Sequence, residues 1–255
     1  MKKCFKITSL LLITVFGCQS VQAQETFSEA GKRRAFAKDI SGMMSGAWKR
    51  WQDGVVVNGV EVDGARGTLN PGDLQGVYFT SDNMMGFFEK EGKPRHYTEC
   101  VKAVALSVEK GMRAWQKGYS HPNIPFPQGA SCSFTLTLCN NVPVTLASGR
   151  SLGRQEMTER ELYGYMLYRL PGEDERTMEV LKSAARAISD GFSRWERTCS
   201  IVDLQASGGI APRPAPMGPG PGPVRGAKAN NGKLSGPCFD AGEMYRSMVE
   251  AMERE

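Results

Sequence analysis

Apolar residues recur along this chain at helical spacing in three segments, each of which ends at a tryptophan. In every segment an apolar residue stands three, seven and eleven positions before the tryptophan. Spacings of three and four place side chains on one stripe of an α-helix. We therefore predict three long amphipathic helices, the first over residues 29–52, whose tryptophans lie in the core. These are Trp51, Trp115 and Trp195.

A second pattern predicts three short helices, because each of three stretches begins with a leucine and carries a helix-capping residue six positions later. A Thr or Asp side chain before a helix accepts a hydrogen bond from the first turn, and apolar residues flanking the cap form a hydrophobic staple. The stretches align without a gap, so we expect their leucines to be equivalent core residues. The leucines are Leu74, Leu152 and Leu234, and the caps are Thr80, Thr158 and Asp240.

Long and short predicted helices alternate along the chain, which indicates an internal repeat. Repeated units bury their apolar faces against their neighbours, and roughly 230 residues suffice for one core. We expect an α+β fold, predominantly α, that forms one compact body of three internal helical repeats, over residues 24–92, 93–171 and 172–255, with β-hairpin and loop insertions. Because the chain opens with a long helix and closes with a short one, we expect these terminal helices to pair.

The insertions between each tryptophan and the next leucine have different patterns. In the first, valine-rich runs flank Asn58-Gly59, a strong type I′ hairpin signal. In the second, residues 132–138 alternate like a strand, and 142–147 is a return strand that Pro143 places at a sheet edge. The third is rich in Pro and Gly over residues 207–237, which predicts an extended or mobile loop.

Residues 1–23 have the pattern of a secretory signal peptide. Three lysines precede a mostly apolar run, and Val21-Gln22-Ala23 is typical of a cleavage site. The run is shorter than the roughly 20 residues that span a bilayer. A lipobox-like Val15-Phe16-Gly17-Cys18 adds lipidation at Cys18 as an alternative. We expect an exported protein, periplasmic or secreted, with no transmembrane span in the mature chain.

The signal peptide also contributes much of the net charge. The whole chain carries +5, but removal of three lysines leaves 29 basic and 27 acidic residues. A nucleic-acid-binding protein normally presents a basic patch or stripe. We therefore expect no nucleic-acid partner.

Export implies an oxidising environment in which cysteines tend to form disulfides. Five cysteines follow the signal peptide, so one is left free or intermolecular. If 132–138 is a strand, the cysteines at its two ends are too far apart to bond to each other. We favour a Cys199–Cys238 disulfide across the third insertion, with another partner for Cys199 as the alternative. The five are Cys100, Cys132, Cys139, Cys199 and Cys238.

Catalytic and ligand-binding patterns are weak. The segment Gly149–Gly153 fits G-x-S-x-G around Ser151, but His96 and His121 both precede it, whereas an α/β-hydrolase has its histidine after the serine. No closely spaced Cys and His set indicates a metal, and no phosphate-binding loop is present. We expect no catalytic residue, no cofactor and no metal.

These patterns favour an exported, non-catalytic envelope or secreted protein that binds another macromolecule through insertions on a helical repeat scaffold. Loops held by a rigid scaffold commonly carry binding, and the expected partner is an envelope or extracellular protein. The alternative is a periplasmic hydrolase or glycan-binding protein whose clefts are lined by the repeated tryptophans. Exposure of the indole rings distinguishes the two.

Overall fold

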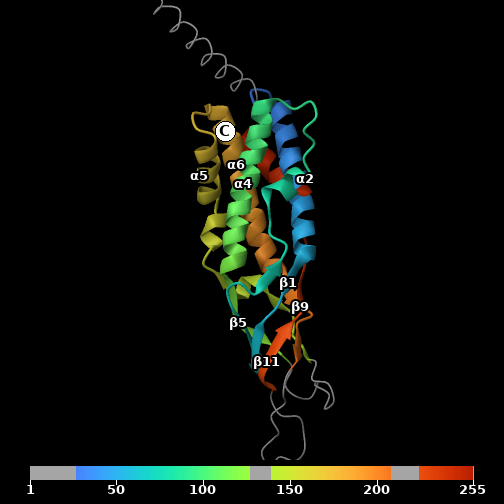
Figure 1. The fold of residues 1–255 in the computed structure, drawn as a ribbon. Coiled ribbons are helices and arrows are strands. Elements are labelled where there is room, and N and C mark those ends of the chain that lie inside the picture. The colour runs from blue at the N-terminus through green and yellow to red at the C-terminus, as the bar shows by residue number, and fades with distance from the viewer. Residues whose placement is uncertain (1–26, 127–138, 208–223, 255) are drawn as a thin grey trace, which may run out of the picture.

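The structure, a computed structural model, describes residues 27–126, 139–207 and 224–254. These residues form six α-helices and two antiparallel sheets, so the fold is mixed α+β. The helices occupy one half of an elongated molecule and the strands the other, drawn at the bottom of Figure 1. We call the bottom half in that view the lower end.

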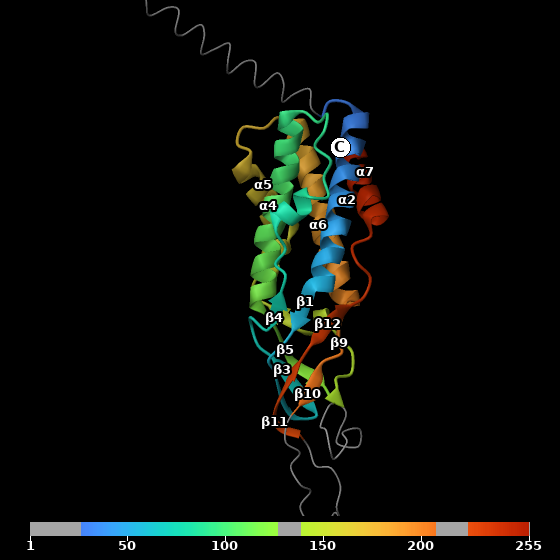
Figure 2. The same cartoon turned by 45° about the vertical axis from the view of Figure 1, so that its right-hand side comes forward.

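Three long helices run side by side and form the body. They are α2 (Ala30–Gly54), α4 (Arg95–Gly118) and α6 (Glu175–Thr198). Each ends three residues after its tryptophan, so the predicted long helices are confirmed. Their apolar stripes face one another and form the upper core (Figure 2).

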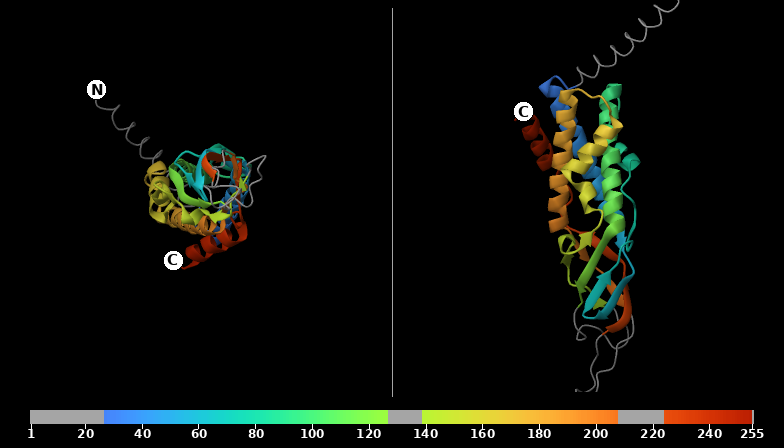
Figure 3. Two further views of the ribbon diagram at one scale, coloured as in Figure 1. Left: turned by 90° about the horizontal axis from the view of Figure 1, so that it is seen from below. Right: turned by 90° about the vertical axis from the view of Figure 1, so that its left-hand side faces the viewer.

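Three shorter helices cover the grooves between neighbouring long helices. They are α3 (Ser81–Met85), α5 (Glu159–Arg169) and α7 (Ala241–Glu253). Helix α7 packs against α6 and also against α2 (Figure 3). Arg34 of α2 forms an ion pair with Glu253 of α7 at 2.5 Å, and Ser45 Oγ donates to the Phe239 carbonyl at 3.0 Å. The terminal helices therefore lie together, as expected.

Each long helix continues directly into a strand, and that strand pairs with the strand before the next short helix. We call these three pairs the stem pairs. They are β1 (Val55–Val57) with β4 (Leu74–Gly76), β5 (Tyr119–Pro125) with β8 (Arg150–Ser151), and β9 (Ser200–Val202) with β12 (Gly232–Ser235).

Between the strands of each stem pair the chain makes an excursion to the lower end. The remaining strands are β2 (Val60–Gly64), β3 (Arg66–Leu69), β6 (Cys139–Asn140), β7 (Val144–Thr145), β10 (Gln205–Ser207) and β11 (Val224–Asn230). One sheet has the order β4-β1-β12-β9-β7 and the other β6-β10-β11-β2-β3-β5-β8. Strands from all three excursions therefore mix within the sheets.

The hairpin predicted at Asn58-Gly59 is wrong, because β1 and β2 belong to different sheets. The turn instead crosses a second turn at Asn230-Asn231. The backbone N–H of Gly59 donates to Asn230 Oδ1, and that of Asn231 donates to Asn58 Oδ1, both at 2.9 Å. Gly59 and Asn231 have φ of 78° and 62°, a region that Gly and Asn tolerate best. Here the chain turns a corner between sheets.

The loop predicted over residues 207–237 is wrong for its described part, since residues 224–235 form β11 and β12. Ala227 and Ala229 are buried and alternate with more exposed neighbours, and β11 pairs with β2 and β10. The two alanines thus give β11 the alternation of a strand. This alternation was missed in the sequence because the segment is rich in Pro and Gly. Residues 208–223, and the strand expected at 132–138, lie outside the described residues.

The return strand predicted over 142–147 is shorter than expected. Only β7 is a strand, and it pairs with β9 at the edge of the five-stranded sheet. Pro143 stands directly before it, so the expected edge position is confirmed. The chain then enters a 3₁₀ turn over Leu146–Ser148.

Leu152 is not a core residue. Leu74 and Leu234 are 3% and 7% exposed, but Leu152 is 87% exposed, so the expectation of three equivalent buried leucines is wrong for this one. The prediction is wrong because the three stretches were aligned without a gap. The strand registers show that the second stretch needs one.

In the stem pairs, Val55 lies opposite Gly76 and Tyr119 lies opposite Ser151. The chain then takes three residues to reach Phe79 but six to reach Met157, the apolar residues before the two caps. A 3₁₀ turn over Arg154–Met157 holds the additional residues. The second stretch therefore carries a three-residue insertion, which moves Leu152 out of the core position.

The same insertion changes the second helix cap. The side chains of Thr80 and Asp240 accept from the N–H groups of Asn83 and Glu243 as predicted. Helix α5 does begin after Thr158. The Thr158 hydroxyl, however, donates to the Gln155 carbonyl at 2.8 Å and accepts no hydrogen bond from the first turn of α5. The side-chain cap predicted at Thr158 is therefore wrong, because the 3₁₀ turn offers the hydroxyl a nearby acceptor.

None of the helices in the described ranges is both long and apolar enough to cross a bilayer. The predicted signal peptide and Cys18 lie outside the described residues.

Candidate functional site

The three repeated tryptophans form a closed ring of hydrogen bonds where the long helices end. Each indole N–H donates to the residue that follows the tryptophan of another long helix, and all six side chains are buried. The bonds are Trp51 to Gln116 at 3.1 Å, Trp115 to Glu196 at 3.1 Å and Trp195 to Gln52 at 2.7 Å. We call these six residues the tryptophan ring.

The indoles of the tryptophan ring also contact one another. Their centroids lie 6.2, 5.5 and 5.3 Å apart with steep interplanar angles, the edge-to-face geometry that aromatic quadrupoles favour. The rings are thus covered by each other and by the core. The structure places the three tryptophans in the core and leaves no indole face for a glycan, which removes the basis for the cleft-lining alternative.

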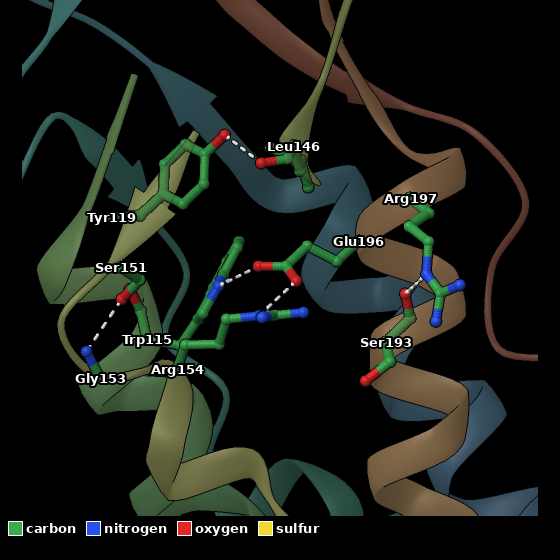
Figure 4. Close-up of polar contacts among 9 residues, drawn as sticks. All are labelled: Trp115, Tyr119, Leu146, Ser151, Gly153, Arg154, Ser193, Glu196 and Arg197. Carbon is green, nitrogen blue, oxygen red and sulfur yellow. Dashed lines mark hydrogen bonds and ion pairs between the residues drawn. The ribbon is translucent and has the colours of Figure 1, made fainter. Parts of the chain in front are cut away.

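Glu196 is the member of the tryptophan ring that differs from the other two acceptors. Gln116 and Gln52 use their N–H groups to donate to the carbonyls of Leu74 and Gly236. A carboxylate can only accept, and the second oxygen of Glu196 accepts from Arg154 Nε at 2.8 Å (Figure 4). The side chain of Glu196 is 4% exposed and that of Arg154 is 57% exposed, so a surface guanidinium neutralises a buried carboxylate.

Ser151 of the G-x-S-x-G motif has a structural role. Its hydroxyl donates to the Trp115 carbonyl at 2.8 Å and accepts from the Gly153 N–H at 3.1 Å. Gly153 lies so close to α4 that a Cβ there would be 2.2 Å from the Ala114 carbonyl carbon. The motif therefore fixes this loop on α4.

His121 and Ser148 are in contact, but in an arrangement opposite to that of a general base. His121 Nδ1 accepts from the Asn123 N–H at 3.3 Å, so Nε2 carries the proton and donates to Ser148 Oγ at 2.9 Å. Ser148 in turn donates to the Thr145 carbonyl. Burial lowers the pKa of His121, which keeps this neutral donor form.

His96 lies in a second cluster, with Glu173 and Cys100. Its Nε2 is 3.1 Å from Glu173 Oε2 and 3.7 Å from Cys100 Sγ, so both partners compete for one nitrogen. The adjacent Glu173 carboxylate raises the pKa of His96. Burial, and then the nearby acids, raise the pKa of the Cys100 thiol. A protonated thiol is a poor nucleophile, because the thiolate is the reactive species.

No group of three His, Cys, Asp or Glu side chains that could hold a metal exists in the part of the chain that the structure describes. The three clusters above contain Ser151, His121 and His96, the chemistry-bearing residues that the sequence singled out.

The cysteines of the favoured disulfide lie near each other as free thiols. Cys199 is buried at the end of α6 and Cys238 is half-buried before α7. A Cβ on Gly236 would be 2.8 Å from Cys199 Cα, so the backbone two residues before Cys238 packs against Cys199. Burial, with a further contribution from Cys238, raises the pKa of Cys199 to about 12. Cys132 and the Cys139 side chain lie outside the described part.

Asparagines join the three excursions at the lower end. Besides the crossed turns at Asn58 and Asn230, buried Asn141 of the second excursion donates to the Ile201 carbonyl and accepts from the Leu204 N–H of the third. The sequence placed Asn141 in a turn but did not indicate these partners. In the sequence, the asparagines that stand between adjacent strand segments are the feature that could have indicated these contacts.

The seven-stranded sheet presents an outward face at the lower end, which we call the β end. Residues alternate along its strands, so one set is buried and the other faces solvent. The buried set includes Val60, Val62, Leu69 and Ile124. The outward set includes Glu61, Asp63, Arg66, Thr68, Asn123 and Lys228.

Comparison with protein-family models, with curated proteins and with solved structures finds no match to this chain.

The ion pair at Glu196 makes a specific prediction. Arg154→Ala should lower the free energy of unfolding by about 1–3 kcal/mol, because one oxygen of a buried carboxylate loses its donor. Water screens the half-exposed arginine, which favours the lower part of that range. Urea denaturation followed by tryptophan fluorescence measures the loss.

Adding Glu196→Gln to Arg154→Ala should restore most of the stability, since a neutral amide is less costly to bury than a carboxylate. The prediction fails if Arg154→Ala is as stable as the wild type, or if the double variant is no more stable than the single one.

Proposed function

We propose that this chain is an exported, non-catalytic protein that binds an envelope or extracellular protein through its β end. The observation that carries the proposal is the convergence of all three excursions at one end of a helical body. Strands and loops held by a rigid body commonly form binding surfaces. The serine and histidine clusters, in contrast, have hydrogen bonds that suit packing rather than catalysis.

The tryptophan ring supports the proposal because it lies where the excursions begin. The strands that leave the long helices start four or five residues after Trp51, Trp115 and Trp195. Hydrogen bonds between the three helix ends therefore fix the starting points of the excursions relative to one another. A surface preformed in this way binds with less loss of conformational entropy than separate flexible loops.

The outward face of the β end suits a protein partner. Glu61 lies opposite Lys228 and Asp63 lies opposite Arg66 in the strand registers, so charges of both signs alternate. A surface for nucleic acid would instead concentrate basic residues against the phosphates.

Export rests on residues 1–23, whose charged start, apolar run and small-residue end match a signal peptide. The exported protein is periplasmic or secreted, with lipidation at Cys18 as the variant that would anchor it to a membrane.

We also propose that the helical body derives from three repeats. Trp51-Gln52, Trp115-Gln116 and Trp195-Glu196 occupy equivalent places in a cyclic arrangement. Each is followed by a stem pair and a short helix. Between the stem pair and the helix cap, the three-residue insertion before Met157 is the largest difference of one repeat from the other two.

Capture of a partner from crosslinked envelope extract tests the proposed function. Mature protein should recover a specific protein, and Arg66→Glu with Lys228→Glu should weaken that recovery because both charges on the β end reverse. The matched control reverses two exposed lysines on the helical body, Lys38→Glu and Lys102→Glu, and should recover the partner as the wild type does.

The function is contradicted if crosslinked extract yields no specific partner while the purified protein turns over a small substrate. Equal recovery by all variants would move the binding surface away from the outward face of the β end.

In the exported protein we propose that Cys199 and Cys238 form a disulfide. The two thiols would pass two electrons and two protons to the disulfide of an exchange partner. Closing a loop of about 40 residues stabilises by roughly 3–4 kcal/mol in the chain-entropy model, and it would fasten the start of α7 to the end of α6.

Peptide mapping of unreduced protein from the native compartment measures the pairing. A fragment that joins the Cys199 and Cys238 peptides is expected. Two free thiols at these positions, or another partner for either of them, would contradict it.

A further inference from the structure

A groove of about 360 Å³ lies where β3, β5 and β8 meet the lower end of α4. Leu69 is almost fully buried, whereas Pro71, Pro122 and Leu152 are exposed. The volume of the groove is near the lower limit of ligand pockets, roughly 300 Å³. The groove therefore has room for one large side chain and a neighbouring small polar group.

Leu152 is the most exposed large apolar side chain of the described residues, at 87%. Its backbone is nevertheless held on both sides. Ser151 is hydrogen-bonded to the Trp115 carbonyl and to the Gly153 N–H (Figure 4). Gly153 also lies against Ala114. An apolar side chain presented from a fixed loop beside other apolar residues is a feature of interaction sites rather than of ordinary surface.

Arg150 is the charged residue among those that line the groove. It lies two positions before Leu152, and both residues line the groove. No acidic side chain lines the groove, and none of the described residues forms an ion pair with the Arg150 guanidinium. Arginine binds carboxylates in a planar, bidentate geometry, so the groove offers a cationic group next to an apolar surface.

We infer that this groove binds an apolar side chain of the partner protein together with a carboxylate beside it. Leu152, Pro71 and Pro122 would cover the apolar group, and Arg150 would pair with the carboxylate. The inference rests on the proposed function and names the part of the β end, and the chemistry, through which the partner is recognised.

The insertion moves a leucine from the core position to the surface, at a place where Ser151 and Gly153 keep it fixed. Burial of that leucine is then gained on binding rather than on folding.

A fluorescent probe tests the groove without knowledge of the partner. The naphthalene sulfonate probe ANS is apolar and anionic, and it should bind the folded protein saturably. Leu152→Asp should weaken binding by about tenfold or more, because it removes apolar surface and adds a repelling charge. Arg150→Gln should weaken ANS but leave the neutral analogue N-phenylnaphthylamine unaffected.

Tyr168→Asp is the matched control, since Tyr168 is the second most exposed large apolar residue, at 77%, and lies on α5. It should bind ANS as the wild type does. Near-ultraviolet circular dichroism verifies that every variant is folded. The inference is overturned if the folded wild type does not bind ANS, or if Leu152→Asp binds it equally well.

The same variants separate this inference from the proposed function. Partner capture that is normal with Leu152→Asp would overturn the groove as the recognition site while leaving the proposed function intact. ANS binding that maps to the groove, in a protein that captures no partner, would overturn the proposed function alone.

Discussion

Three indole N–H groups are buried together at the point where the long helices end, and each needs an acceptor. A buried donor without a partner costs about 1–3 kcal/mol. The chain meets this requirement by placing an amide or carboxylate directly after Trp51, Trp115 and Trp195, so each of these Trp-Gln or Trp-Glu pairs both donates and accepts. The neighbouring Trp48 is outside this ring, and its buried indole N–H has no hydrogen-bond partner among the described residues. Because each indole reaches a different helix, the bonds are satisfied together only when α2, α4 and α6 close into a ring.

The rest of the structure is arranged around this ring. Small residues four positions before two of the tryptophans, Gly111 and Gly191, admit the apolar residues that precede the next helix caps. A Cβ at these glycines would lie 2.5 Å from Met157 Sδ and 2.6 Å from Phe239 Cε1. The short helices are thereby fixed in the grooves between the long ones. The stem pairs begin within two residues of the helix ends, so the positions of the β strands follow from those of the helices.

The long helices were predictable because their apolar stripes follow from the local sequence alone. The burial of Trp51, Trp115 and Trp195 followed from the same pattern, but their hydrogen-bond acceptors did not, since those lie on other helices. The β region was the least predictable. Asn58-Gly59 has the chemistry of a hairpin turn, yet the strand after it pairs with β3 and β11 instead of β1. Pairing of β2 with β11 from the third excursion, rather than the local turn sequence, determines the strand order at this point. The position of Leu152 was also predicted wrongly, because an alignment without gaps cannot reveal a three-residue insertion.

A double-mutant cycle on Trp195 and Gln52 measures whether the hydrogen bonds of the tryptophan ring couple the helices. The free energy of unfolding is measured for Trp195→Phe, Gln52→Leu and the double variant. Each single variant leaves one buried partner unpaired, so the double variant should be more stable than the sum predicts by about 1 kcal/mol. Losses that add to within roughly 0.3–0.5 kcal/mol would show that the two residues are independent and would contradict the account.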